Sequence, residues 1–324
     1  MNNAKHLKRV LLNSISQLSY HREFLSNPDK DFTRNRKLPL HEIIKCILTL
    51  EAGTIKDELY RYFDYHSSTP TASALIQQRK KIKYEAFRWL FDSFNFMTYR
   101  SKHHLYKGYR LLAIDGATTV IPTNHHNLET YVEKQCKGGF NAFHINALYD
   151  LLEHTYDDVV IQGEPSKDEN QAFRDLVDRY LGRKAIFIAD RGYENYNGFE
   201  HVVHSKNKYL IRVKDIRSYN SIAGSLVANQ EDEFDVDVFR VLTRKQTLMT
   251  KACPQLYKFL PSNTQFDYMD KENSFYEFNC RIIRFQLDID TYECIITNLD
   301  RKEFSTKEIK ELYHMRWGIE TSFR

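Results

Sequence analysis

The chain has 324 residues, of which 42% are hydrophobic and 28% charged, with a formal net charge of +4. It is long enough for one large domain with additions or for two to three modules. No stretch approaches the roughly 18 apolar residues of a membrane span, and the apolar run near the N-terminus is too short for a signal-peptide core. We therefore expect a cytoplasmic protein with no membrane contact. The five cysteines are dispersed and form no C-x-x-C pair, which argues against a disulfide framework or a structural zinc site: Cys46, Cys136, Cys253, Cys280 and Cys294.

Residues 1–100 are predicted to form an all-helical domain. Apolar residues recur at three- and four-residue spacing in LHEIIKCILTL, TIKDELYRYF and YEAFRWLFDSF, and Pro39 and Pro70 lie where helices should begin or be interrupted. This third has 17 Lys and Arg against 10 Asp and Glu, a net charge of +7, whereas residues 101–324 carry −3. The bias favours a polyanionic partner for the helical domain alone.

One stretch of this domain, TASALIQQRKKIKYEAF, is predicted to be a single basic helix. Its cations are Arg79, Lys80, Lys81 and Lys83. Such a run is equally consistent with a solvated helix face and with a helix that contacts DNA phosphates and reads bases.

Residues 105–215 are predicted to form the first part of an α/β core. YRLLAIDG, FNAFHINALYDLL and YDDVVIQGE are typical of strands, and SKDENQAFRDLVDRYLG of a helix opened by a capping box of Ser166 and Glu169. KAIFIAD, ENYNGFEHVVHS and KYLIRVK then predict a strand, a helix and a strand. This order of elements is typical of a mixed sheet flanked by helices.

Residues 216–290 are predicted to be a β-rich antiparallel insertion, because FDVDVFRVLT and FYEFNCRIIRFQLDI alternate apolar and polar residues. Residues 291–324 return to the core. Their last helix is expected to begin at a second capping box, formed by Ser305 and Glu308.

Three acidic residues stand out as candidate ligands. Asp115 and Asp190 each follow an apolar, β-branched run, so we expect them at strand ends on the carboxyl edge of the sheet, where α/β folds bind ligands. Tyr313, Arg316 and Glu320 are spaced i, i+3, i+7 on one face of the last helix, beside an apolar stripe of Leu312, Met315, Ile319 and Phe323. Converging carboxylates of this kind can hold two hard cations that promote in-line attack on a phosphodiester.

Each of these residues also has a purely structural interpretation. An aspartate at a strand end is most often a turn or helix-cap residue. Arg316 could simply pair with Glu320 at i, i+4, and Tyr313 could be an ordinary half-buried aromatic residue. The joint pattern favours the catalytic interpretation.

The motifs IDGA around Asp115, DRGY around Asp190 and YHMRWGIE from Tyr313 to Glu320 resemble those of the aspartate-aspartate-glutamate (DDE) transposases of insertion-sequence family four. That family's last signature reads Tyr, two residues, Arg, three residues, Glu, six residues, Lys. The closing Lys would fall at position 327, whereas the sequence stops at Arg324. We therefore expect a truncated protein or a fragment.

The resemblance implies a ribonuclease-H-like fold in which Asp115, Asp190 and Glu320 are catalytic and hold two Mg²⁺ ions, with Mn²⁺ able to substitute. It implies DNA contacts by four further residues: Arg191, Tyr193, Tyr313 and Arg316. The expected activity is metal-dependent DNA cleavage and 3′-hydroxyl strand transfer that moves an insertion sequence. The expected partners are terminal inverted repeats and target DNA, bound by a homodimer.

Two alternatives stay open at this point. The chain could be a truncated, catalytically inactive transposase relic that only binds DNA. The second alternative is a haloacid-dehalogenase-like phosphatase. Such an enzyme would need a second aspartate two residues after Asp115, where Ala117 stands instead.

Overall fold

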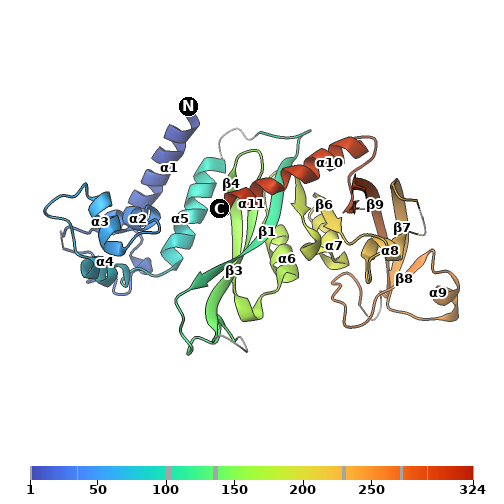
Figure 1. Cartoon of the computed structure of the whole chain (residues 1–324), viewed down its shortest axis with the longest axis horizontal. Helices are drawn as coiled ribbons and strands as arrows, with labels where there is room; N and C mark the ends of the chain where they lie inside the picture. Colours follow the sequence, from blue (N-terminus) through green and yellow to red (C-terminus); the bar gives the residue numbers. More distant parts are fainter. Residues whose placement is uncertain are drawn as a thin grey trace. The chain divides into compact units, whose positions relative to one another are not determined.

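The computed structural model describes residues 2–34, 36–99, 104–133, 138–227, 231–270, 273–289 and 291–323. The chain divides into two compact units, residues 1–102 and 103–324 (Figure 1). Cys136 lies outside the described residues; the other cysteines are free thiols. None of the described helices combines the length and the apolar character needed to cross a membrane.

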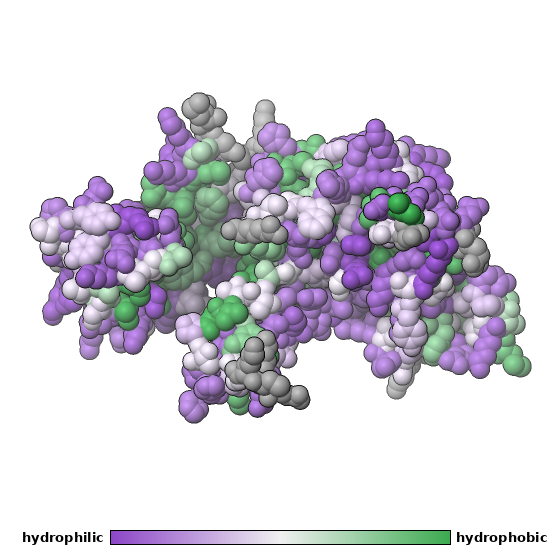
Figure 2. Space-filling view, in the orientation of Figure 1, coloured by the Kyte–Doolittle hydropathy of each residue, from purple (hydrophilic) through white to green (hydrophobic). Residues whose placement is uncertain are grey.

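The first unit is helical, as its apolar periodicity predicts, and in Figure 2 its surface is mainly hydrophilic over α2, α3 and α4 and more hydrophobic over α1 and α5. Its elements are α1 (Asn2–Leu18), η1 (Arg22–Phe24), α2 (Leu40–Leu48), α3 (Ile55–Tyr62), α4 (Ala72–Arg79) and α5 (Glu85–Tyr99). Pro39 precedes α2, and the side chains of Thr54 and Thr71 accept hydrogen bonds from the first turns of α3 and α4. These caps supply partners for amides that a helix start leaves unpaired.

The prediction that residues 71–87 form a single basic helix is wrong. α4 ends at Arg79 and α5 begins at Glu85. Between them the amide of Lys83 donates to the carbonyl of Phe24 at 2.9 Å, and Ile82 packs against the hydrophobic core. Tertiary pairing has overridden local helix propensity, so the basic residues do not share one helix face.

The second unit is built on one mixed sheet flanked by helices, in agreement with the predicted fold class (Figure 1). Its strands are β1 (Arg110–Ile121), β2 (Tyr131–Val132), β3 (Phe140–Asp150), β4 (Thr155–Gly163), β5 (Ala185–Ala189), β6 (Lys208–Val213), β7 (Phe234–Thr243), β8 (Tyr257–Phe259), β9 (Phe275–Asp288) and β10 (Thr291–Thr297). The strand order is β2-β3-β1-β5-β6-β10-β9-β7-β8, and β4 also pairs with β3. β1, β5 and β6 are parallel, whereas β3 and β4 run antiparallel to their neighbours.

Helices cover both faces of this sheet, and the strand residues alternate between them. The helical elements are η2 (Glu164–Ser166), α6 (Glu169–Arg179), η3 (Arg191–Tyr193), α7 (Tyr196–His204), α8 (Ile222–Leu226), α9 (Leu248–Ala252), α10 (Thr306–Met315) and α11 (Trp317–Ser322). Leu112 and Ile114 of β1 pack in the hydrophobic cluster of α6 and α7. Leu111 and Ala113 pack in the cluster of α10 and α11. Both faces of the central strands are therefore buried, which accounts for their continuous apolar runs.

One of the two predicted capping boxes is wrong. The N-cap of α6 is Asp168, whose carboxylate accepts from the amide of Gln171 at 2.9 Å. Ser166 lies in η2, where its hydroxyl donates to the carbonyl of Gly163. An aspartate nearer the helix start has taken the capping role. The second box, Ser305 with Glu308, is confirmed at the start of α10.

The strands within residues 216–290 continue the central sheet. β10 pairs antiparallel with β6, β9 with β10, and β7 with β9. The long segment between β6 and α10 thus widens the sheet at its β6 edge.

A buried ion pair ties these added strands to the last helices. Arg281 of β9 is 2% exposed and donates to both carboxylate oxygens of Asp235 on β7, at 2.8 and 2.6 Å. Arg281 also donates to the carbonyl of Phe304 at 2.7 Å, and Asp235 accepts from the Thr306 hydroxyl in the first turn of α10. Burial acts to raise the pKa of Asp235, but the hydrogen bonds from Arg281 and Thr306 outweigh it and hold that pKa below its ordinary value. The start of α10 is therefore fixed to β7 and β9.

Replacing Asp235 with Ala should lower the free energy of unfolding by about 3 kcal/mol, because it leaves the buried Arg281 guanidinium without its carboxylate. Urea unfolding followed by circular dichroism measures this. Asp237→Ala is the matched control on the same strand. The Asp237 side chain is 71% exposed, so its loss should change stability by no more than about 0.5 kcal/mol. Equal effects of the two substitutions would contradict the role given to Asp235.

Candidate active site

The pairing of β1 with β5 places two aspartates side by side. The strands are parallel, and Ile114 lies opposite Ala189. Asp115, still within β1, and Asp190, directly after β5, are the next residues along the chain. Because side chains alternate along a strand, Asp115 lies on the same face as Ala113, which packs in the cluster of α10 and α11.

Asp115 does not lie at a strand end, which corrects the prediction from sequence. β1 continues to Ile121 because its antiparallel pairing with β3 extends past the last residue that pairs with β5. Only the parallel pairing stops before Asp115. Asp190 does follow the end of β5, and its Oδ1 accepts from the amide of Gly192 at 2.8 Å in the turn η3.

The last helix, predicted as continuous, is divided into α10 and α11 at Arg316. Arg316 keeps right-handed helical dihedral angles (φ −51°, ψ −32°), and the amides of Arg316 and Ile319 each donate to a carbonyl three residues back. This tightened turn preserves the direction of the chain, so Glu320 remains next to Arg316.

Arg316 connects two of the three acidic residues. Its Nη2 donates to Glu320 Oε1 at 2.7 Å, and its Nη1 lies 3.5 Å from Asp115 Oδ2. The pair with Glu320 expected at i, i+4 is thus present, and the same guanidinium also reaches the β1 aspartate. The Nε and Nη1 atoms of Arg316 are buried and make no hydrogen bond to the described residues. The guanidinium therefore has donors to spare for another acceptor.

The electrostatics also indicate that the acidic residues converge. Burial raises the pKa of Asp115 to about 6, and the carboxylates of Asp190 and Glu320 add to the increase. The Gly116 amide, which donates to Asp115 Oδ1 at 2.9 Å, and the Arg316 guanidinium act in the opposite direction. The negative charge of Asp115 is thus incompletely compensated, which favours binding of a further positive charge.

The donor set suits a hard divalent cation, because all three candidate ligands offer carboxylate oxygens. Within the described ranges, no three His, Cys, Asp or Glu side chains stand close enough together to form a ready-made metal cage. The positive group beside Asp115 and Glu320 is the Arg316 guanidinium. Asp115 and Glu320 thus already contact one cationic group, which indicates that their surroundings favour positive charge.

The other predicted contact residues divide into exposed and buried ones. Arg191 is exposed, directly after Asp190. Tyr193 is buried, and its hydroxyl donates to Asn146 Oδ1 at 2.9 Å. Tyr313 is also buried and packs in the cluster of α10 and α11. Tyr193 and Tyr313 are thus buried side chains with packing contacts, whereas Arg191 is exposed.

A second polar group lies on the opposite side of β1, and sequence reasoning missed it. His144 Nε2 lies 3.1 Å from Glu169 Oε1, close enough for an ion pair although not aligned as a hydrogen bond. A Cβ atom added to Gly116 would lie 2.6 Å from His144 Nε2, and one added to Gly192 would lie 3.2 Å from Glu169 Oε2. The imidazole and carboxylate of this group thus lie close to Gly116, next to Asp115, and to Gly192, two residues after Asp190. The available signal was the presence of His144 and Asn146 among the apolar residues in the middle of strand β3, since buried polar groups need partners.

Comparison with known families decides the identity of this unit. A family model described as transposase DDE domain matches residues 106–324. The chain belongs to the transposase DDE domain family. The matched region contains all three candidate acidic residues and leaves out the helical unit. A search of curated proteins gave no significant match. Membership of the transposase DDE domain family indicates a function in DNA transposition and recombination, with DNA as the partner.

In this transposase domain, the stability of the metal-free protein should depend on the protonation of Asp115. A carboxyl with a folded pKa of about 6 binds its proton more tightly than an unfolded aspartate does at about 3.9, so its stabilising contribution is complete below pH 4 and is lost as the pH rises to 6. Asp115→Asn should therefore gain stability relative to the wild type over this range, by at most about 3 kcal/mol. Chemical unfolding in EDTA at pH 4, 5, 6 and 8 checks this. A difference that stays constant with pH would contradict the raised pKa.

Proposed function

We propose that the chain is a DDE transposase of insertion-sequence family four. It would cut DNA at terminal inverted repeats and join the freed 3′-hydroxyl to target DNA. The observation that supports this most is the placement of Asp115 and Glu320 around one guanidinium, with Asp190 on the neighbouring strand, inside the region that matches the family. The Tyr313, Arg316 and Glu320 spacing favours family four within the wider family.

In this proposal Asp115, Asp190 and Glu320 hold two Mg²⁺ ions, with Mn²⁺ able to substitute, which supply water activation and charge stabilisation when bound. The chain's own residues position the DNA. Arg316 offers buried donors that have no hydrogen-bond acceptor among the described residues, and a phosphate oxygen would satisfy them. Arg191 is exposed and can contact the backbone beside Asp190.

Tyr193 and Tyr313 act in this proposal through packing. The Tyr193 hydroxyl is already paired with Asn146, which fixes the turn that carries Arg191. Tyr313, on α10, packs in the hydrophobic cluster that holds α10 and α11 against the sheet, just before Arg316. The protein would work as a homodimer on paired DNA ends, with the helical unit helping to recognise the terminal repeats.

A cleavage assay tests the proposal. With Mg²⁺, the chain should nick a labelled duplex that carries the terminal repeat found beside its gene, and Asp190→Ala or Glu320→Ala should reduce nicking at least about 100-fold, because each removes a cation ligand. Asp237→Ala, which alters an exposed residue of β7, is the matched control and should leave nicking unchanged. Nicking that persists in both acidic-site variants would refute the assigned site. Specific binding without nicking would favour the inactive DNA-binding relic.

Cation binding can be tested without activity. Mg²⁺ at 100 times its dissociation constant should stabilise the wild type by about 2.7 kcal/mol, because a ligand that binds only the folded state shifts the unfolding equilibrium. Asp190→Asn should lose most of this stabilisation. Thermal unfolding at increasing Mg²⁺ concentrations gives the measurement. An equal response in the variant would show that Asp190 is not a ligand.

A further inference from the structure

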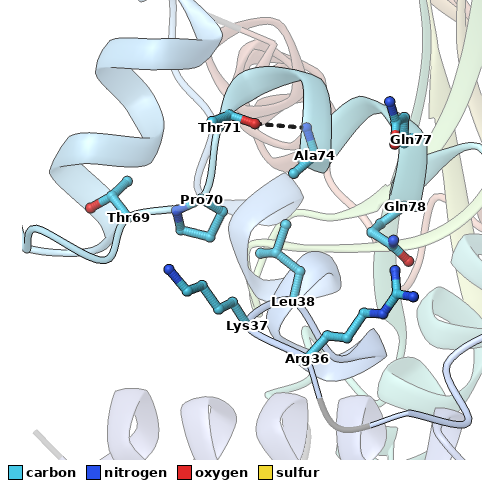
Figure 3. Close-up of a pocket in the computed structure, with 9 residues that line it drawn as sticks. All are labelled: Arg36, Lys37, Leu38, Thr69, Pro70, Thr71, Ala74, Gln77 and Gln78. Atoms are coloured by element: carbon cyan, nitrogen blue, oxygen red, sulfur yellow. Dashed lines mark hydrogen bonds between the residues drawn. The ribbon is translucent and has the colours of Figure 1, made fainter.

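The helical unit contains an open pocket of about 500 Å³ beside the first turn of α4 (Figure 3). The strip of chain before α2 forms one wall, and α4 with the residues preceding it forms the other. The lining residues are Arg36, Lys37, Leu38, Thr69, Pro70, Thr71, Ala74, Gln77 and Gln78. None of them is acidic.

The chemistry of this lining suits an anion that also carries hydrogen-bonding groups. Arg36 and Lys37 are exposed cations at adjacent positions. In Figure 3 the Arg36 side chain extends towards Gln78, whereas Lys37 extends in the opposite direction. The Lys37 ammonium donates to the Ser68 carbonyl at 3.0 Å, which leaves two of its three donors for a ligand. The amides of Gln77 and Gln78 add both donors and acceptors.

The walls of the pocket are held by the core of the unit. Leu38, next to Lys37, and Leu75 of α4 are buried in the same hydrophobic cluster. The Thr71 hydroxyl accepts from the Ala74 amide at 3.2 Å and fixes the start of α4. The Gln77 amide donates to the Ser73 hydroxyl at 3.3 Å, which orients one glutamine along the helix. The cations and amides are therefore presented on a fixed frame.

We propose that this pocket is a DNA-binding site distinct from the cleavage site, in which Arg36 and Lys37 contact backbone phosphates and Gln77 and Gln78 contact a base edge. The inference rests on the proposed function. Cations in a lining that contains no acidic residue can bind phosphates, and glutamine amides can pair with the two groups that adenine presents in the major groove. The helical unit also carries the positive charge of the chain, +7 over residues 1–100. An acidic peptide would use the cations but would gain less from paired amides.

Binding of the full chain to fluorescein-labelled duplexes tests this. One duplex carries the terminal repeat found beside the gene, and the other is a scrambled sequence of the same composition. Arg36→Ala with Lys37→Ala should raise the Kd for both duplexes roughly 10-fold or more, and should reduce the slope of log Kd against log salt by about 2, because each lost phosphate contact removes about 0.9. The control is Lys5→Ala with Lys8→Ala, which removes the same charge from exposed positions of α1 and should change the slope by much less.

The glutamine contact gives a separate readout. Gln77→Ala should weaken binding to the repeat duplex roughly 10-fold and leave binding to the scrambled duplex unchanged, since base contacts specify sequence whereas phosphate contacts do not. Circular dichroism establishes that each variant is folded. Arg36→Gln with Lys37→Gln, which keeps side-chain length, replaces the alanine pair if that pair does not fold.

The outcomes separate this inference from the proposed function. If the pocket variants bind DNA with the affinity and salt slope of the α1 control, the inference that this pocket binds DNA is wrong. Loss of nicking in Asp190→Ala would still support the proposed transposase activity. Variants that lose binding to poly-L-glutamate but keep their DNA affinity would overturn the inference about the pocket in favour of an acidic peptide. A wild-type chain that neither binds nor nicks DNA would refute both.

Discussion

The candidate site depends on the parallel pairing of β1 with β5. That register sets Ile114 opposite Ala189, and so places Asp115 and Asp190 on adjacent strands directly beyond the paired residues. The same strands are buried on both faces, so the alternation of their side chains is fixed by packing. A slip of one residue would turn Asp115 towards α6 and would put Ile114 or Gly116 in its place near Arg316. Hydrophobic burial of the strands therefore determines where the charged residues lie.

Arg316 partly neutralises the negative charge that this arrangement brings together. Burial in this partly enclosed site raises the pKa of Asp115, and repulsion from the carboxylates of Asp190 and Glu320 adds to the increase. The guanidinium offsets part of it by contacting Asp115 and Glu320 together. Two of its buried nitrogens nevertheless make no hydrogen bond to the described residues. Perturbed pKa values and buried polar atoms without hydrogen bonds are common at functional sites, which favours this group of residues as the candidate site.

The sequence predicted the features that depend on local pattern. The buried strands, the helical first unit and the Ser305 cap all follow from short-range periodicity or motif, although the cap predicted at Ser166 does not form. Features that depend on distant partners were missed. The length of β1 beyond Asp115 comes from pairing with β3, and the break before Glu85 comes from pairing with the segment around Phe24. The contact between His144 and Glu169 likewise joins a strand to a helix that no local pattern connects.

Glu320 is the candidate acidic residue farthest along the chain from the other two, because about 130 residues separate it from Asp190. A flexible connection of that length would leave the last helix free to lie in many places. Here the chain instead adds β7, β9 and β10 to the sheet, so the start of α10 is anchored through Arg281 and Asp235. Leu312 and Ile319 then bury the helices against β1 and β5. An ordered extension of the sheet that carries Asp115 therefore holds Glu320 close enough to share the Arg316 guanidinium with Asp115.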